Sequence, residues 1–146
     1  MRLFCLLGIL LASMVSARAV ESGPVLAVNV GGATRQFTAA ELLGRRDAAT
    51  VKIPLDPSYG RAMTYRAVPL RALLSLFGRD PADTIEVRAT DGFVAQLPRA
   101  LIEGKAVPWV AIEDPAHPWP RLPKKTMSAG PFYLVWQNPE RSGISP

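Results

Sequence analysis

Turn signals recur along this chain and keep its regular segments short. Gly31-Gly32 and Asp91-Gly92 are residue pairs that favour tight β-hairpins, because such turns need residues that tolerate positive φ. Residues 84–90 alternate apolar and polar side chains directly before the second pair, which is typical of a strand. No segment has the length of a helix that repeatedly connects parallel strands. The sequence therefore predicts an α+β domain with a mixed, mostly antiparallel sheet and short packed helices.

The expected strands follow from runs of apolar and alternating residues. In the third strand along the chain, Val51, Ile53 and Leu55 are expected on one face, because side chains of a strand alternate between its two faces. Strands are expected over residues 25–30, 33–37, 50–55, 62–68, 84–90, 93–97, 109–112 and 132–136.

Three short helical segments are expected between these strands. Thr38 and Glu41 have the spacing of a capping box that opens a helix, and Gly44 is expected to end it in the left-handed conformation. Pro69 is expected at the first position of a second helix, where a missing N–H costs nothing. A helical turn is expected over residues 98–102.

Residues 1–19 have the pattern of a cleavable signal peptide. Arg2 supplies a positive charge, residues 3–15 are almost wholly apolar, and Ala17-Arg18-Ala19 fits the small-residue pattern at a cleavage site. A helix of this length spans about 20 Å, short of a hydrocarbon core of ~30 Å, so a permanent anchor is the weaker interpretation. The expected product is one domain, residues 20–146, in the periplasm or secreted.

Cleavage at this site would change the cysteine count and the charge. Cys5 is the only cysteine, so the processed chain would have no thiolate to form a disulfide, bind a metal or act as a nucleophile. Loss of Arg2 and Arg18 leaves fifteen basic residues against twelve acidic ones, a net charge of about +3. The basic residues are scattered, apart from Arg45-Arg46 and Lys124-Lys125, so nucleic acid is not an expected partner.

Three segments carry a resemblance to a known family. Residues 68–74 read VPLRALL, residues 85–93 read IEVRATDGF, and residues 130–135 read GPFYLV. In order and spacing they resemble the molybdopterin-binding domain of the sulfite oxidase family. The resemblance covers about residues 51–136 and implies that family's fold, with a molybdopterin-type cofactor and oxidoreductase activity as the family's function.

The chain departs from that family at two positions that matter for the cofactor. The family holds its metal through a cysteine thiolate, which the processed chain would lack. The family's arginine in the closing strand falls at Tyr133, which cannot pair with a phosphate as a guanidinium does. The resemblance therefore implies the scaffold more than the enzyme.

Two loop segments contain the candidate binding residues. The segment 56–66 combines two arginines and two tyrosines near a glycine, a set that suits an anionic ligand, although tyrosines that cover a core are the alternative. The proline-rich segment 114–121 holds the only histidine and an aromatic side chain suited to contact. The candidate ligand- or partner-binding residues are Tyr59, Arg61, Tyr65, Arg66, His117, Trp119 and Arg121.

No catalytic or metal-binding residue is assigned, because the chain has no nucleophile elbow, phosphate loop or dinucleotide fingerprint. The expected function is an exported non-catalytic binding or accessory module of a cell-envelope redox system, with a c-type cytochrome or another envelope redox protein as its partner. One alternative is a molybdopterin-dependent oxidoreductase. Another is an envelope copper-binding protein using His117, Met63 and Met127, since copper(I) accepts thioether ligands.

Overall fold

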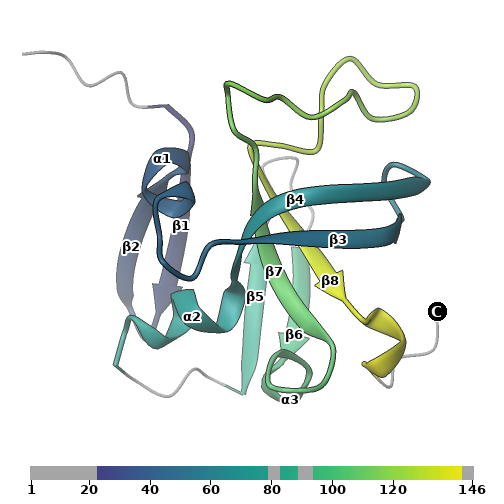
Figure 1. Ribbon diagram of the computed structural model, residues 1–146. Helices are drawn as coiled ribbons and strands as arrows, with labels where there is room; N and C mark the ends of the chain where they lie inside the picture. The colour runs from purple at the N-terminus through teal and green to yellow at the C-terminus, as the bar shows by residue number, and fades with distance from the viewer. Residues whose placement is uncertain (1–22, 79–82, 89–93, 143–146) are drawn as a thin grey trace, which may run out of the picture.

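The computed structural model describes residues 23–78, 83–88 and 94–142. The predicted signal peptide and the predicted Asp91-Gly92 turn lie outside these residues. In chain order the elements are β1 (Val25–Val30), β2 (Ala33–Thr38), α1 (Ala39–Leu43), β3 (Ala49–Asp56), β4 (Arg61–Pro69), α2 (Leu70–Ser75), β5 (Thr84–Arg88), β6 (Val94–Pro98), α3 (Arg99–Ile102), β7 (Val107–Ile112), β8 (Phe132–Gln137) and the 3-10 turn η1 (Pro139–Arg141) (Figure 1).

The strands form two hairpins and one larger sheet. β1 pairs with β2, β5 pairs with β6, and the four-stranded sheet has the order β3-β4-β7-β8. The strand pairings within the described residues are antiparallel, which confirms the expected mostly antiparallel domain with short helices. Within the same residues, no helix is both long enough and apolar enough to cross a membrane.

The Gly31-Gly32 turn is confirmed as a two-residue hairpin connection. Val30 pairs with Ala33 across it, and both glycines have positive φ, 57° and 82°. Only glycine adopts this pair of conformations without steric cost, and the resulting twist matches that of the two strands. Local sequence is therefore sufficient to place β2 beside β1.

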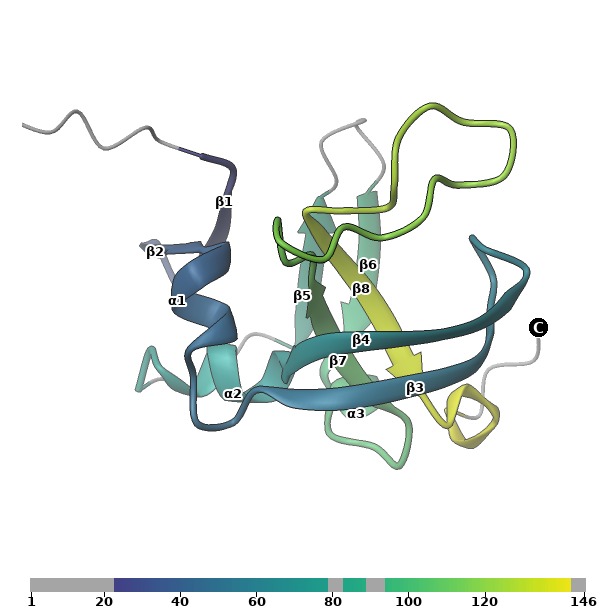
Figure 2. The ribbon, with the colours of Figure 1, turned by 45° about the horizontal axis from the view of Figure 1, so that its top comes forward.

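Strand β4 connects two parts of the large sheet. Residues 61–67 of β4 pair with β3, whereas residues 66–69 pair with β7. The β3–β4 hairpin therefore extends beyond the β7–β8 pair and crosses in front of it, as both ribbon views show (Figure 1, Figure 2).

The crossing separates two apolar cores, one on each side of β7 and β8. Val110 and Ile112 of β7 face a core built with helices α1 and α2 and with the two small hairpins. Ala111 of β7 and Val135 of β8 face a second core under the β3–β4 hairpin. β7 therefore shows no simple alternation of buried and exposed residues, because both of its faces are covered.

A register shift at the end of β3 corrects one sequence prediction. Val51 and Ile53 are buried as expected, but Leu55 is 71% exposed and Asp56 is 0% exposed. The pairing with β4 shifts between Ile53 and Asp56, and such an irregularity reverses which side chains face inward. The shift therefore turns a carboxylate into the core where the alternation predicts a leucine.

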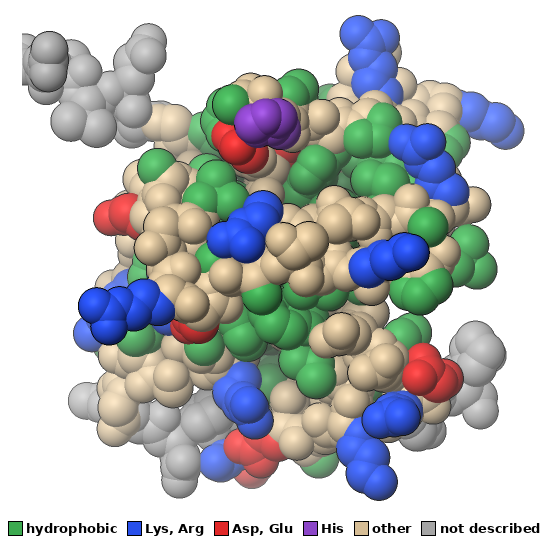
Figure 3. All heavy atoms as spheres, in the orientation of Figure 1, with side chains coloured by type: hydrophobic (Ala, Val, Ile, Leu, Met, Phe, Trp, Pro, Cys, Tyr) green, Lys and Arg blue, Asp and Glu red, His purple; other side chains and the backbone are tan. Residues whose placement is uncertain are grey.

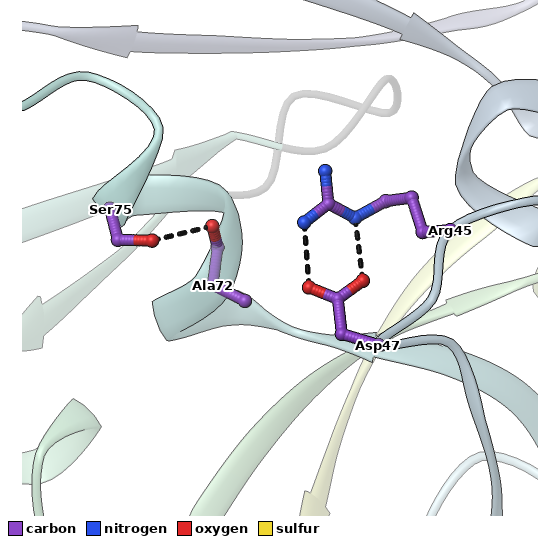
Figure 4. A network of polar contacts seen from close by, with 4 residues as sticks. All are labelled: Arg45, Asp47, Ala72 and Ser75. Atoms are coloured by element: carbon purple, nitrogen blue, oxygen red, sulfur yellow. Dashed lines mark hydrogen bonds and ion pairs between the residues drawn. The ribbon is translucent and has the colours of Figure 1, made fainter.

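The first helix begins as predicted and ends differently. Thr38 and Glu41 form the full capping box. Gly44 has φ −81° and ψ −3°, which is the right-handed helical conformation and not the predicted left-handed one. Arg45 and Asp47 then form a bidentate ion pair, with N–O distances of 2.7 and 2.6 Å, in the turn that leads to β3 (Figure 4). That pair holds the pKa of the Asp47 carboxyl below its usual range.

The second helix is short and begins one residue after the predicted start. Pro69 is the last residue of β4 and the N-cap of α2, so the regular helix begins at Leu70 and ends at Ser75. Ser75 Oγ donates to the carbonyl of Ala72 at 2.9 Å near that end (Figure 4). Leu70, Leu73 and Leu74 are buried and carry the helix onto the first core.

Candidate functional site

A buried carboxylate lies where the β3–β4 hairpin meets β8. Asp56 Oδ1 accepts the backbone N–H groups of Ser58 and Tyr59 at 2.9 and 3.0 Å. Asp56 Oδ2 accepts the hydroxyl of Tyr65 at 2.8 Å. Asp-Pro-Ser after a strand is a sequence in which the Asp side chain caps its own turn, and that signal could have identified Asp56.

All three tyrosines of the chain surround this carboxylate. Tyr133 Oη lies 2.8 Å from Ser58 Oγ and 3.3 Å from Asp56 Oδ1. Tyr59 Oη accepts the backbone N–H of Ala129 at 3.0 Å, which joins the hairpin to the chain just before β8. The three phenols are therefore bonded within the protein.

Burial raises the pKa of each of the three phenols above its ordinary value. For Tyr65 the desolvation of the ring is the largest cause, and the hydrogen bond to the Asp56 carboxylate is the second. For Tyr59 and Tyr133 desolvation is again the largest cause of the raised pKa. These tyrosines therefore remain protonated and do not act as bases at neutral pH.

An aromatic cluster joins the long 113–131 loop to the same hairpin. Trp119 packs edge-on against Tyr65 with ring centroids 4.8 Å apart, and against Tyr133 at 6.5 Å. Tyr65 and Tyr133 lie 6.0 Å apart in a similar arrangement. Such contacts contribute packing energy beyond simple burial, so Trp119 holds the loop down on the second core.

Glu113 fastens that loop from the inside. Its Oε1 accepts the backbone N–H of Trp119 at 2.7 Å, and its Oε2 accepts the hydroxyl of Ser128 at 2.9 Å. Gly130 lies against this carboxylate, and a Cβ at Gly130 would overlap the carboxylate and come within 2.9 Å of Glu113 Cβ. The spacing of Glu113 from its partners is irregular, so no sequence motif marks this network.

The structure divides the predicted binding residues into two groups. Tyr59 and Tyr65 are 5% and 1% exposed and belong to the second core, as in the alternative that the sequence leaves open for them. Trp119 is partly buried on the same core. The exposed members are Arg61, Arg66, His117 and Arg121. His117 Nδ1 lies 3.0 Å from Asp114 Oδ2, within the loop.

Exposed cations gather on the hairpin and on the loop beside it. Figure 3 shows lysine and arginine side chains along the β3–β4 hairpin and on the loop above it. Within the part of the chain that the structure describes, none of their side chains forms a hydrogen bond or ion pair. We call these six residues the basic face: Lys52, Arg61, Arg66, Arg121, Lys124 and Lys125.

The acidic residues near the basic face do not neutralise it. Asp56 is buried and Glu113 is occupied by the loop, as described above. Asp114 accepts from the Ala116 N–H and pairs with His117, and the His117 contact is the main cause of the lowered pKa of the Asp114 carboxyl. Sequence reasoning did not include Lys52, although its alternation with buried Val51 and Ile53 marks it as outward-facing.

The structure describes residues that the sequence analysis considered for a cofactor or a metal. The hydroxyl of Tyr133, the position that the resemblance assigns to an arginine, is bonded to Ser58 and Asp56. Residues 23–78, 83–88 and 94–142 contain no group of three His, Cys, Asp or Glu side chains placed to hold a metal ion. Of the copper ligands considered from the sequence, Met63 is buried, whereas His117 and Met127 are exposed.

Comparisons with protein-family models, with curated proteins and with solved structures each found no match to this chain.

Proposed function

We propose that this chain is an exported, non-catalytic binding module that serves a cell-envelope redox system. In this proposal the scaffold is related to the molybdopterin-binding domain but has lost that family's cofactor chemistry. The partner is a redox protein of the same compartment, such as a c-type cytochrome. The module captures its partner through the basic face.

One observation supports this proposal above the others: six exposed cations on the hairpin and the neighbouring loop have no counter-charge among the described residues. Exposed like charges repel one another and destabilise a compact chain slightly, so folding alone does not account for their gathering. Arginine is also among the residues that dominate binding energy at protein interfaces. The buried tyrosines and Asp56 act in this proposal as the rigid support under the hairpin.

Site-specific photo-crosslinking in cells that export the protein tests the proposal. A photoreactive residue is placed at Arg66 or Arg121 in the basic face, and at Arg71 on α2 as the control. We expect the same discrete cross-linked partner from positions 66 and 121 and none from position 71. No partner at any position, or the same partner at all three, would contradict a binding function for this face.

Two further measurements on the exported protein test the other parts of the proposal. N-terminal sequencing should begin at Val20, whereas a retained Met1 on membrane-bound material would support an anchor. Metal analysis and absorption spectra distinguish the alternatives, because molybdenum or a pterin would support the oxidoreductase and copper would support the copper-binding protein.

A further inference from the structure

We infer that the partner contacts the basic face through an extended protein segment rich in Asp and Glu. The inference rests on the proposed binding function and names the chemistry of the partner. It starts from the outer surface of the β3–β4 hairpin. Thr50, Lys52, Thr64 and Arg66 are exposed on this surface, while the residues between them face the second core.

The register of the hairpin places the two cations at a defined separation. Thr50 pairs with Arg66, and Lys52 pairs with Thr64, so Lys52 and Arg66 are diagonal neighbours. Diagonal neighbours on one face of an antiparallel pair lie about 7–8 Å apart. Alternate side chains of an extended chain lie about 7 Å apart. Two carboxylates at positions i and i+2 of an extended segment therefore match Lys52 and Arg66, and the threonine hydroxyls supply donors beside them.

The loop extends this cationic surface. Arg121, Lys124 and Lys125 are exposed on the loop that Trp119 and Glu113 fasten to the core. Because the loop is held by those contacts, its cations are partly ordered before a partner binds, and less entropy is lost on binding. Asp56 and Glu113 are directed inward, so their carboxylates accept bonds from the protein and are not offered to the partner.

The described surface favours a protein over a membrane as the occupant. Its large exposed hydrophobic residues are Val25, Leu55, Val94 and Met127, which belong to four separate segments. Insertion into a lipid interface needs a group of apolar side chains on one face, and isolated ones are ordinary on a soluble surface. Single-stranded nucleic acid is also less suited, because bases stack on open aromatic rings and Trp119 is packed against Tyr65 and Tyr133.

Peptide binding to the full exported protein tests the inference. The probe is a fluorescent peptide of ten glutamates, compared with a peptide of ten glutamines. The test variant is Lys52→Gln with Arg66→Gln. The matched control is Arg71→Gln with Lys105→Gln, which removes two exposed cations from other parts of the surface. Circular dichroism of both variants checks that they fold like the parent protein.

We expect the glutamate peptide to bind and the glutamine peptide not to bind. The test variant should bind the glutamate peptide about tenfold more weakly, while the control stays within about twofold. Added salt should weaken the binding, since exposed charges are screened. Equal losses in both variants would show general attraction to a cationic protein and overturn the inference. Tighter binding to phosphatidylglycerol vesicles or to a single-stranded oligonucleotide would also overturn it.

The two proposals fail in different ways. Suppose that a partner cross-links at positions 66 and 121 but that peptide binding is unchanged in the Lys52 and Arg66 variant. The proposed acidic segment would then be wrong, and the binding function would still be supported. The absence of any cross-linked partner would contradict the binding function itself.

Discussion

Asp56 is the residue on which the arrangement of the hairpin most depends. A fully buried carboxylate is costly unless donors compensate it, and here two backbone N–H groups and the Tyr65 hydroxyl do so at 2.8–3.0 Å. The Tyr133 hydroxyl is 3.3 Å from the same carboxylate and closer to Ser58. Tyr65 therefore stabilises the buried charge of Asp56 more than Tyr133 does.

The variant Tyr65→Phe tests that inequality. It removes a short hydrogen bond to a buried charge and should lower the free energy of unfolding by about 1.5–3 kcal/mol. Tyr133→Phe is the matched comparison and should cost less, because its single proton is shared between Ser58 and Asp56. Urea denaturation of both variants measures the difference. A Tyr133→Phe variant that is the less stable of the two would contradict this account of Asp56.

Gly130 is a second residue whose identity follows from a contact. In Gly130→Ala the new methyl group would meet the Glu113 carboxylate, so either the loop shifts or the network to Trp119 and Ser128 breaks. We expect a loss of about 1–3 kcal/mol in the free energy of unfolding. Gly23→Ala is the control, since nothing lies within 4 Å of a Cβ there. Thermal melts that coincide for the two variants would contradict this expectation, because they would show that the loop accommodates the methyl group without loss of stability.

Among the secondary-structure elements, helix α1 is stabilised at its first turn by side-chain hydrogen bonds. Helix α1 has five residues, too few to be stable alone. Its capping box supplies hydrogen-bond acceptors to the backbone N–H groups of both Thr38 and Glu41. The hydrogen bond from the Thr38 N–H is the main cause of the lowered pKa of the Glu41 carboxyl. The stability that the cap gives to the helix therefore depends on pH.

Replacement of Thr38 by Ala should destabilise the protein by about 0.5–2 kcal/mol at neutral pH, as loss of an N-cap does. Because the pKa of Glu41 is lower in the folded state, the stability it adds is present above its unfolded value of about 4.3 and is lost as the pH falls through the folded value. Alanine keeps the backbone N–H and removes the hydroxyl, which is the second cause of the lowered pKa of Glu41. Thr38→Ala should therefore flatten only part of the loss of melting temperature below about pH 5. Thr50→Ala, on an exposed strand face, is the control.

Residues 23–78, 83–88 and 94–142 form two apolar cores that share strands β7 and β8. Every tyrosine of the chain belongs to the second core or its edge, so the phenols report on that core alone. A spectroscopic probe of tyrosine ionisation therefore measures the integrity of the β3–β4 hairpin and its loop.

Alkaline titration should lower the stability of the folded protein. The folded-state pKa values of Tyr59, Tyr65 and Tyr133 are raised, so above about pH 10 the unfolded chain releases protons that the folded chain retains. Stability then falls as the pH rises. Phenolate absorbance should appear together with unfolding, whereas protein in guanidinium chloride should titrate near pH 10. A folded protein that titrates near pH 10 would contradict the burial of these phenols.

Features that depend on residues close together in the chain can be predicted from the amino-acid sequence alone. Positive φ at Gly31-Gly32 turns β1 into β2, and three residues separate Thr38 from the Glu41 that completes its cap. The antiparallel class and most strand positions follow from the same local patterns. The left-handed conformation predicted for Gly44 is wrong, because a glycine near a helix end permits that conformation without requiring it.

The arrangement of the site depends on contacts between residues that are distant in the sequence. The register shift that buries Asp56 and exposes Leu55 depends on donors from Tyr65 and Tyr133, which lie 9 and 77 positions away along the chain. The alternation of β3 alone predicts the opposite arrangement. Tyr59 and Tyr65 lie in the core for a related reason: the buried carboxylate accepts the Tyr59 backbone N–H and the Tyr65 hydroxyl. The strand pattern alone does not predict the bond between Tyr65 and Asp56.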